Sequence, residues 1–371
     1  MGHVNPGAID PVPLHLAQPG LTDRPPWWQM PSDILACFEG VSPSCCKWYR
    51  IADARLGIES DDFALRTRFQ RVYGECVSSY NATVEPRLHC RVQIVNEVPA
   101  RSVTFSGPGE TELVDFMLDL FRDRGYVELN PETSGWRAIG LTGRSHPILI
   151  SKGNHFLVDA AEPWQPLIAN CAVNWAMSMQ PDVLFFHAGA VGVGDAGVLI
   201  IGGKGSGKTT LSMALAARGQ DFLGDEVAAV RTHTTELLPM RRAVSIRHGP
   251  RSSSVDRTLR DRRYPTEQFP DGSTRVRVDP GEFFPSAHER SPLLRSIFFL
   301  RAFEDRARVE SFQPRVPDLR LLAPLPCTFW GTSPAKPLMQ AARLLSSANC
   351  YNLYPGMPDE TASLVERIVR N

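Results

Sequence analysis

The feature that most constrains the fold of this chain is a glycine-rich segment between an apolar run and a run of helix-forming residues. Residues 202–209 read Gly-Gly-Lys-Gly-Ser-Gly-Lys-Thr and match the phosphate-loop pattern G-x-x-x-x-G-K-[ST] in full. The apolar run 198–201 precedes the segment, and the helix formers 208–218 follow it and end at Gly219. A strand, a loop and a helix in this order predict an α/β core that binds phosphate groups.

Each residue type in this segment has a role in holding phosphate. Glycines let backbone N–H groups curl around phosphate oxygens, and the new helix directs its positive end at them. Lys208 would reach the β- and γ-phosphates, and the Thr209 hydroxyl would ligate Mg²⁺. A glycine turn that binds nothing is the alternative. We therefore expect Mg²⁺ at Thr209, and the phosphates of ATP at the following residues: Gly202, Gly203, Lys204, Gly205, Ser206, Gly207, Lys208, Thr209 and Thr210.

An acidic pair, Asp225 and Glu226, follows Lys208 by only 17 residues, at the end of a short predicted strand, 221–223. One helix and one return strand would bring these carboxylates back to the phosphates. There they could hold Mg²⁺ and accept the proton of an attacking hydroxyl. The alternative is a solvated acidic pair in a loop.

The residues from His187-Ala-Gly-Ala-Val through the glycine-rich segment to Phe222-Leu-Gly-Asp-Glu resemble the HPr serine kinase family, over about residues 186–249. Within that family the resemblance is to the HPr-kinase-related group that includes lasso peptide kinases. It implies an α/β fold with a P-loop kinase core of the HPr kinase/PEP carboxykinase-like type. It also implies an ATP- and Mg²⁺-dependent kinase that phosphorylates a hydroxyl, with a serine of a peptide or protein, such as a lasso peptide (RiPP) precursor, as acceptor.

The same resemblance assigns roles to three side chains. Asp225 would be the general base that takes the proton of the acceptor serine. Glu226 stands where the family has a second Asp that is tied to the metal. His187, 15 residues before Gly202, would lie near the γ-phosphate or orient the acid; a core histidine is its alternative. Relatives often assemble into homo-oligomers, so a homo-oligomer is one possibility here, and the residues leave the oligomeric state open.

A basic stretch follows the acidic pair. Residues 241–263 hold eight Arg against two acids and read as a long loop. Arg241 and Arg242 lie nearest the acids in sequence and are the best candidates to clamp the transferred phosphate or a substrate carboxylate, with Arg242 as the catalytic one. A solvated basic loop is the alternative.

The 371 residues are enough for more than one domain. Residues 1–35, rich in Pro and Gly, predict an extended arm; 36–165 predict a small α+β domain, and 166–371 the kinase domain. In the α+β domain, strands are expected at 64–72 and 88–95, with one amphipathic helix of about 13 residues that begins at Leu113 and stops at Gly125.

Composition excludes several classes of function. Forty basic and 40 acidic residues cancel, which argues against a broadly basic nucleic-acid binder. No apolar run reaches a membrane span of ~18 residues, and no signal peptide is evident, so we expect a cytoplasmic protein without a membrane partner. The eight Cys show no CxxC pairing, so neither a zinc site nor a disulfide framework is expected.

Two other functions fit the same core. A P-loop fixes the phosphate site and leaves the acceptor open, so a small-molecule kinase is one alternative. A nucleotide-binding regulator with an idle catalytic acid is the other. The residues also leave open pyrophosphate as donor and a phosphatase activity.

Overall fold

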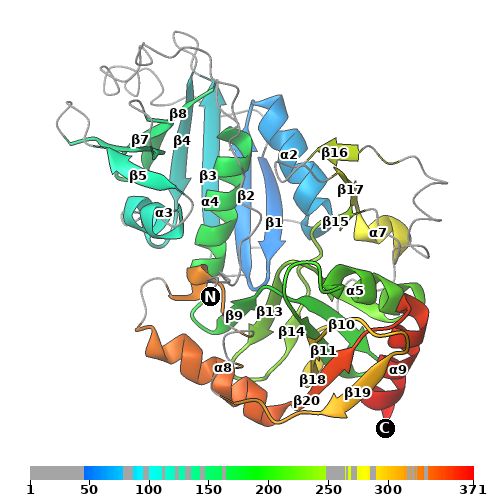
Figure 1. Cartoon of the computed structure of the whole chain (residues 1–371). Helices are drawn as coiled ribbons and strands as arrows, with labels where there is room; N and C mark the ends of the chain where they lie inside the picture. The colour runs from blue at the N-terminus through cyan, green and yellow to red at the C-terminus, as the bar shows by residue number, and fades with distance from the viewer. Residues whose placement is uncertain are drawn as a thin grey trace. The chain divides into compact units, whose positions relative to one another are not determined.

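The chain divides into two compact units in a computed structural model (Figure 1). One lies within Pro11–Arg71 and Val77–Gln180, and the other comprises Pro181–Asn371 with the segment Val72–Cys76. The predicted arm lies outside the described residues, and the predicted boundary at 165/166 stays a prediction. The structure describes residues 46–77, 87–94, 100–110, 113–121, 125–129, 135–142, 147–160, 164–247, 264, 266–268, 274–284, 290–315, 318, 322, 324–329 and 333–371.

The N-terminal unit is built on an eight-stranded sheet in the order β1-β2-β3-β4-β8-β7-β6-β5. Its described strand pairs are antiparallel except β2 with β3. Helix α4 packs on β1 and β2 and buries Trp164 and Trp175. The elements are β1 Cys46–Ile51, β2 Ala54–Ser60, α2 Phe63–Tyr73, β3 Arg87–Ile94, β4 Ala100–Ser106, α3 Leu113–Phe121, β5 Tyr126–Leu129, β6 Arg137–Leu141, β7 Leu149–Lys152, β8 His155–Asp159 and α4 Trp164–Ser178. The turn η2 Gly74–Cys76, which follows α2 in the chain, belongs to the C-terminal unit.

The strand predicted at 64–72 is wrong, because these residues form helix α2. Leu65, Phe69 and Val72 are buried, and their spacing of four and three residues is that of one helix face. Asp62 caps the helix, since its Oδ1 accepts a hydrogen bond from the Leu65 backbone N–H at 3.0 Å. The Asp62 cap and the helical spacing of the buried residues together outweigh the preference of the β-branched residues for a strand.

The C-terminal unit is built on a six-stranded mixed sheet in the order β12-β10-β11-β18-β20-β19. Strands β11, β18 and β20 are parallel, and β10 and β11 form an antiparallel hairpin. The bounds are β9 Val183–Phe186, β10 Gly189–Val193, β11 Ala196–Ile201, α5 Lys208–Ala217, β12 Asp221–Gly224, β18 Leu293–Leu300, β19 Arg308–Ser311, η6 Pro326–Phe329, α8 Ala335–Ser347, β20 Asn349–Tyr354 and α9 Pro358–Arg370.

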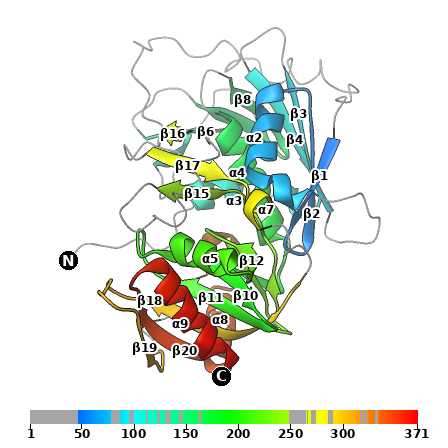
Figure 2. The same ribbon diagram turned by 90° about the vertical axis from the view of Figure 1, so that its right-hand side faces the viewer.

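Both faces of this sheet are covered, because alternate side chains of each strand point to opposite sides. Val198 and Ile200 of β11 join the apolar cluster that includes Leu211 of α5 and Val365 of α9. Leu199 and Ile201 join the cluster on the other face, to which α8 contributes Ala341 and Leu344. Figure 2 shows α5 and α9 side by side in front of the sheet. Within the described residues, no helix has the length and hydropathy needed to cross a membrane.

Two smaller sheets complete the unit, in the orders β14-β13-β9 and β15-β17-β16. Strand β15 lies within the stretch predicted as a loop, and the prediction is wrong there: Val244 and Ile246 alternate with more exposed residues and pack against α5 and β12. The rest of that stretch, 248–263, lies outside the described residues. The bounds are β13 Ala228–Arg231, β14 Leu237–Leu238, β15 Val244–Arg247, β16 Thr266–Gln268, β17 Thr274–Val278 and α7 Pro280–Phe283.

A buried carboxylate joins α5 to α9. Glu366 accepts hydrogen bonds from Arg218 Nη2 and Gln220 Nε2, each at 2.9 Å, and it is 9% exposed. Because Glu366→Ala would leave both donors without this acceptor, we expect it to lower the free energy of unfolding by about 1–3 kcal/mol. Urea denaturation measures this loss, and Glu366→Gln, which keeps one acceptor, should lose less. Equal stability of Glu366→Ala and wild type would contradict the assigned role.

Candidate active site

The sheet topology brings the glycine-rich loop and the acidic pair to one edge. Strand β10 is antiparallel to both β11 and β12, so these two strands run in the same direction. Their carboxyl ends, Ile201 and Gly224, therefore lie at the same edge of the sheet, with the loop after the first and Asp225 after the second. This is the edge at which α/β sheets bind ligands.

Gly224 fixes the position of Asp225 through close backbone packing. A Cβ on Gly224 would lie 3.0 Å from both the Met240 and the Val227 carbonyl oxygens. A side chain on residue 224 would crowd these backbone carbonyls, so glycine favours the close approach of the strand to residue 240.

The loop has the backbone geometry that its glycines predict. Gly205 and Gly207 have φ values of 81° and 97°, which favour glycine over other residues. A Cβ on Gly202 would lie 2.4 Å from Ser206 Oγ, so this glycine allows the loop to fold back on itself. Ser206 Oγ is buried and accepts or donates no hydrogen bond in the structure. It is therefore available to a group that enters the loop.

Lys208 begins helix α5 and is 8% exposed. Its ammonium donates hydrogen bonds to the carbonyls of Gly202 at 2.8 Å and Gly203 at 3.2 Å, so it lies over the loop. Burial lowers the pKa of Lys208, while the charges of Asp225 and Glu226 act in the opposite direction. The ammonium of Lys208 therefore lies over the loop. A bound phosphate would replace the two carbonyls as its hydrogen-bond partner.

Asp225 is buried, at 1% exposure. Thr209 Oγ1 donates a hydrogen bond to Asp225 Oδ2 at 2.7 Å, whereas the buried Oδ1 has no partner. Burial, aided by the charge of Glu226, raises the pKa of Asp225 to about 7, against the lowering effects of the Thr209 hydrogen bond and Lys208. A carboxylate with this pKa can take up a proton near neutral pH.

His187 and Glu226 lie together beside Asp225. His187 Nδ1 is 3.1 Å from the Glu226 carbonyl oxygen and 3.8 Å from Glu226 Oε2. Because a carbonyl can only accept, Nδ1 carries a proton. Glu226 has a φ of 67°, a left-handed conformation that non-glycine residues adopt at a cost of about 1 kcal/mol. The contact with His187 forms at this turn and orients the side chains of the acidic pair.

Arg241 and Arg242 have different surroundings. Arg241 is 3% exposed and donates hydrogen bonds to the carbonyls of Phe222 at 2.7 Å and Phe284 at 2.8 Å. Its guanidinium therefore holds strand β12 in place. Arg242 lies over the Tyr73 ring, 5.8 Å from the centroid. The structure thus brings His187, Lys208, Thr209, Asp225 and Glu226 together, and gives both arginines contacts with other parts of the unit.

The residues present fit Mg²⁺ better than a metal held by protein ligands alone. The structure describes no group of three or more His, Cys, Asp or Glu that could hold a metal ion. Mg²⁺ in nucleotide sites is bound through one or two carboxylates with substrate phosphates and water. Thr209 Oγ1 and the unpartnered Oδ1 of Asp225 are oxygen donors of this kind.

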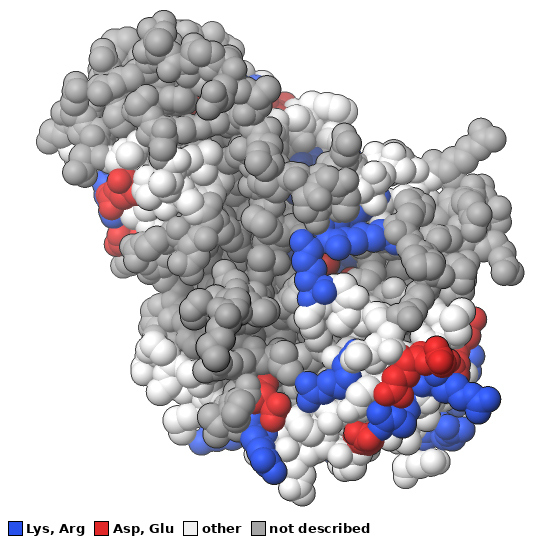
Figure 3. All heavy atoms as spheres, in the orientation of Figure 1, with Lys and Arg blue, Asp and Glu red and all other residues white. Residues whose placement is uncertain are grey.

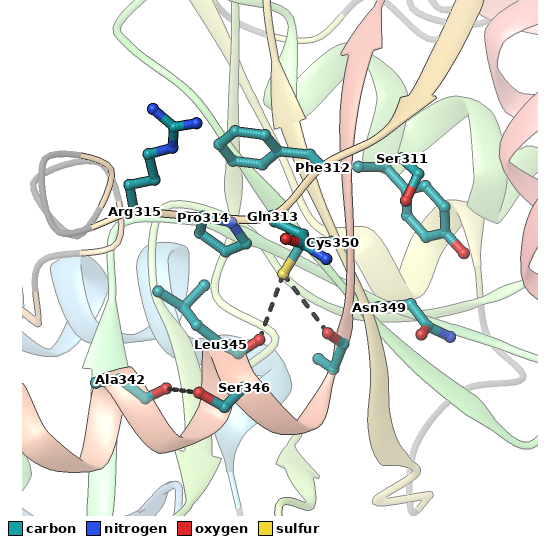
Figure 4. Close-up of a pocket in the computed structure, with 12 residues that line it drawn as sticks. Ser311, Phe312, Gln313, Pro314, Arg315, Ala342, Leu345, Ser346, Asn349 and Cys350 are labelled. Carbon is teal, nitrogen blue, oxygen red and sulfur yellow. Dashed lines mark hydrogen bonds between the residues drawn. The ribbon is translucent and has the colours of Figure 1, made fainter.

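A hollow of about 490 Å³ lies at the end of the sheet opposite to the glycine-rich loop (Figure 4). It is lined by the ends of β19 and α8 and by the start of β20, where Cys350 Sγ lies 3.7 Å from the Leu345 carbonyl oxygen. Burial raises the pKa of this thiol to about 11. Since β11 and β20 share one direction, the start of β20 is far from the glycine-rich loop, and this hollow is no part of the candidate site.

Charges on the visible face of the C-terminal unit are mixed. Figure 3 shows acidic and basic side chains next to one another at the lower right of the view. Arg308 and Glu304 of the C-terminal unit form an ion pair, at 2.8 Å.

No protein-family model matches the chain, and no curated protein matches its sequence. Among solved structures, the Hpr(Ser) kinase/phosphatase from Coxiella burnetii is similar to part of it, at 16% sequence identity and a TM-score of 0.25. The match covers 50% of this chain and 94% of that chain. A likeness of this size defines no fold here, so the residues of the candidate site carry the function proposed below.

Proposed function

We propose that this protein is an ATP- and Mg²⁺-dependent kinase that transfers the γ-phosphoryl group to a hydroxyl. The observation that carries the proposal is the contact of Thr209 with the buried Asp225, beside a lysine that lies over the loop. A phosphate-binding lysine, a hydroxyl for the metal and a carboxylate with a raised pKa are the groups that phosphoryl transfer needs.

The side chains of the site would have different roles in the reaction. Backbone N–H groups of the loop and the start of α5 hold the phosphates, and Lys208 exchanges its bonds to Gly202 and Gly203 for phosphate oxygens. Bound Mg²⁺ would supply neutralisation of the charge on the transferring group, with Thr209 and Asp225 as its protein ligands. Asp225 also positions the acceptor hydroxyl and takes its proton, as the hydroxyl oxygen bonds to phosphorus and the bond to ADP breaks.

A serine of a peptide or protein is the acceptor that we propose, and a lasso peptide precursor is the sharper form of this proposal. It rests on the resemblance of residues 186–249 to the HPr-kinase-related group. A small metabolite would fit the same phosphate site, because the site does not define the acceptor.

Phosphate transfer can be tested directly with the full-length protein. Incubation with Mg·ATP and either a peptide library or a metabolite extract should add about 80 Da, the mass of one phosphoryl group, to a serine peptide, as read by mass spectrometry. Labelling of a metabolite alone would favour the small-molecule kinase. Binding of Mg·ATP with no transfer to any acceptor would favour the regulator and contradict the kinase.

A further inference from the structure

The turn between β18 and β19, residues 301–307, lies beside the glycine-rich loop. Strands β11 and β18 are parallel and paired, with Ile201 opposite Phe299, so their carboxyl ends meet at the same edge. A Cβ on Gly202 would lie 3.0 Å from Leu300 Cβ. A Cβ on Gly207 would lie 3.2 Å from Cζ of Phe303. The Phe303 ring therefore lies against the last glycine of the loop.

Hydrogen bonds from the next strand hold this turn in place. The Arg301 N–H donates to the Leu353 carbonyl at 2.8 Å, and the Glu304 N–H donates to the Pro355 carbonyl at 2.9 Å. Arg301 Nε also donates to Asn352 Oδ1 at 2.8 Å. The turn is thus fixed to β20 and the residues after it before any ligand arrives, which lowers the entropy cost of binding.

An ion pair and a ring contact fix the far end of the turn. Arg308 pairs with Glu304 at 2.8 Å and with Glu310, and its guanidinium lies 3.9 Å from the centroid of the Tyr354 ring. Gly356 allows close backbone approach, because a Cβ there would lie 2.6 Å from the Ala307 nitrogen. Figure 2 shows β18, β19 and β20 side by side where these contacts form.

An open hollow of about 670 Å³ lies along the turn, lined by residues 303–308. Its volume is within the range of about 300–1,000 Å³ that small-molecule sites occupy. Phe303 is 36% exposed, so part of its ring is accessible from solvent. The hollow combines this aromatic surface with the polar side chains of Asp305 and Arg306. The Phe303 ring that lines it also lies against Gly207 of the glycine-rich loop.

We propose that Phe303 and this turn are the platform for the aromatic base of a nucleoside triphosphate whose phosphates lie on the loop. Base and phosphates of one nucleotide must lie along the same edge of the sheet, and the turn is a neighbour of the loop on that edge. Aromatic side chains stack on bases of any kind, since every base has a π face. This inference rests on the proposed phosphate site.

Phe303 has a second role to separate from base stacking, because its contact with Gly207 also supports the loop. A ligand without a base distinguishes the two roles. Inorganic tripolyphosphate with Mg²⁺ offers the same chain of phosphates as ATP and nothing for Phe303 to stack on. Loss of loop support would weaken the binding of both ligands, whereas loss of stacking would weaken the binding of ATP alone.

Titration calorimetry of the full-length protein with each ligand tests the assignment. We expect Phe303→Ala to lower the affinity for Mg·ATP by about 10-fold and the affinity for Mg·tripolyphosphate by less than about twofold. Phe303→Trp should keep the affinity for Mg·ATP. Leu338→Ala is the matched control, because it removes an exposed apolar side chain from helix α8 on the other face of the sheet. It should change neither affinity.

The other outcomes overturn the inference in distinguishable ways. An equal loss of affinity for both ligands in Phe303→Ala would mean that the ring only supports the loop. Unchanged affinity for Mg·ATP, or wild-type protein that binds the two ligands equally well, would place the base elsewhere and leave the phosphate site intact. Wild-type protein that binds neither ligand would refute the proposed phosphate site itself.

Discussion

Asp225→Asn should abolish phosphoryl transfer and at the same time stabilise the free protein at alkaline pH. The amide keeps an acceptor for Thr209 Oγ1, so the local fold is retained. It has no negative charge for Mg²⁺ and takes no proton from a hydroxyl. Loss of a general base alone costs about 10²–10⁴-fold in rate, and we expect a fall of at least this size in a transfer assay with Mg·ATP.

The stability effect follows from the pKa of Asp225, which burial raises from 3.8 to about 7. Between these two pH values the folded protein keeps a proton that the unfolded chain has lost, so wild-type stability falls as pH rises and levels off above pH 7. Asp225→Asn does not titrate. The difference in unfolding free energy, variant minus wild type, should therefore grow by about 2–3 kcal/mol from pH 5 to pH 8.

Glu226→Gln provides the internal check on this explanation. Its charge is one of the causes that raise the pKa of Asp225, so its removal should lower that pKa and weaken the pH dependence of stability. Urea denaturation of the three proteins at pH 5 and pH 8 measures the effect. A stability difference between Asp225→Asn and wild type that is the same at both pH values would mean that Asp225 is ionised throughout.

The elements around the loop are predictable because their signals are local. The hairpin β10–β11, helix α5 and strand β12 follow one another within residues 189–224, and glycines mark where each ends. The equal direction of β11 and β12 follows from this order, so sequence reasoning could place Asp225 near Lys208. Helix α2 shows the limit: its residues also fit a strand, and only burial on one helix face, with the Asp62 cap, decides between the two.

The remaining parts of the site depend on pairing between distant segments. Phe303 meets Gly207 because β18 pairs with β11, strands almost 100 residues apart in the chain, and no local pattern marks that pairing. Arg241 shows the same dependence. It lies near the acidic pair in sequence, and the structure shows that its guanidinium donates hydrogen bonds to the carbonyls of Phe222 and Phe284. The partners of Phe303 and of Arg241 do not follow from their positions in the sequence.

Lys208→Ala should reduce phosphoryl transfer by about 10²–10³-fold, the usual cost of one preorganised charge at a transition state. Little of Lys208 is accessible to solvent, since the residue is 8% exposed. A guanidinium is larger and planar, so Lys208→Arg should restore little of the activity. Lys336→Ala is the matched control, because it removes an exposed lysine from helix α8 and should change activity by less than about twofold.

A second consequence separates loss of the charge from general damage to the loop. Lys208 is one of the groups that lower the pKa of Asp225, so its removal should raise that pKa further. The residual activity of Lys208→Ala should then need a higher pH than wild type to ionise the base, and the ascending limb of its pH–rate profile should shift to alkaline pH. An unshifted limb with reduced activity would indicate that Lys208 does not act on Asp225, and a variant with more than a tenth of wild-type activity would contradict its role in transfer.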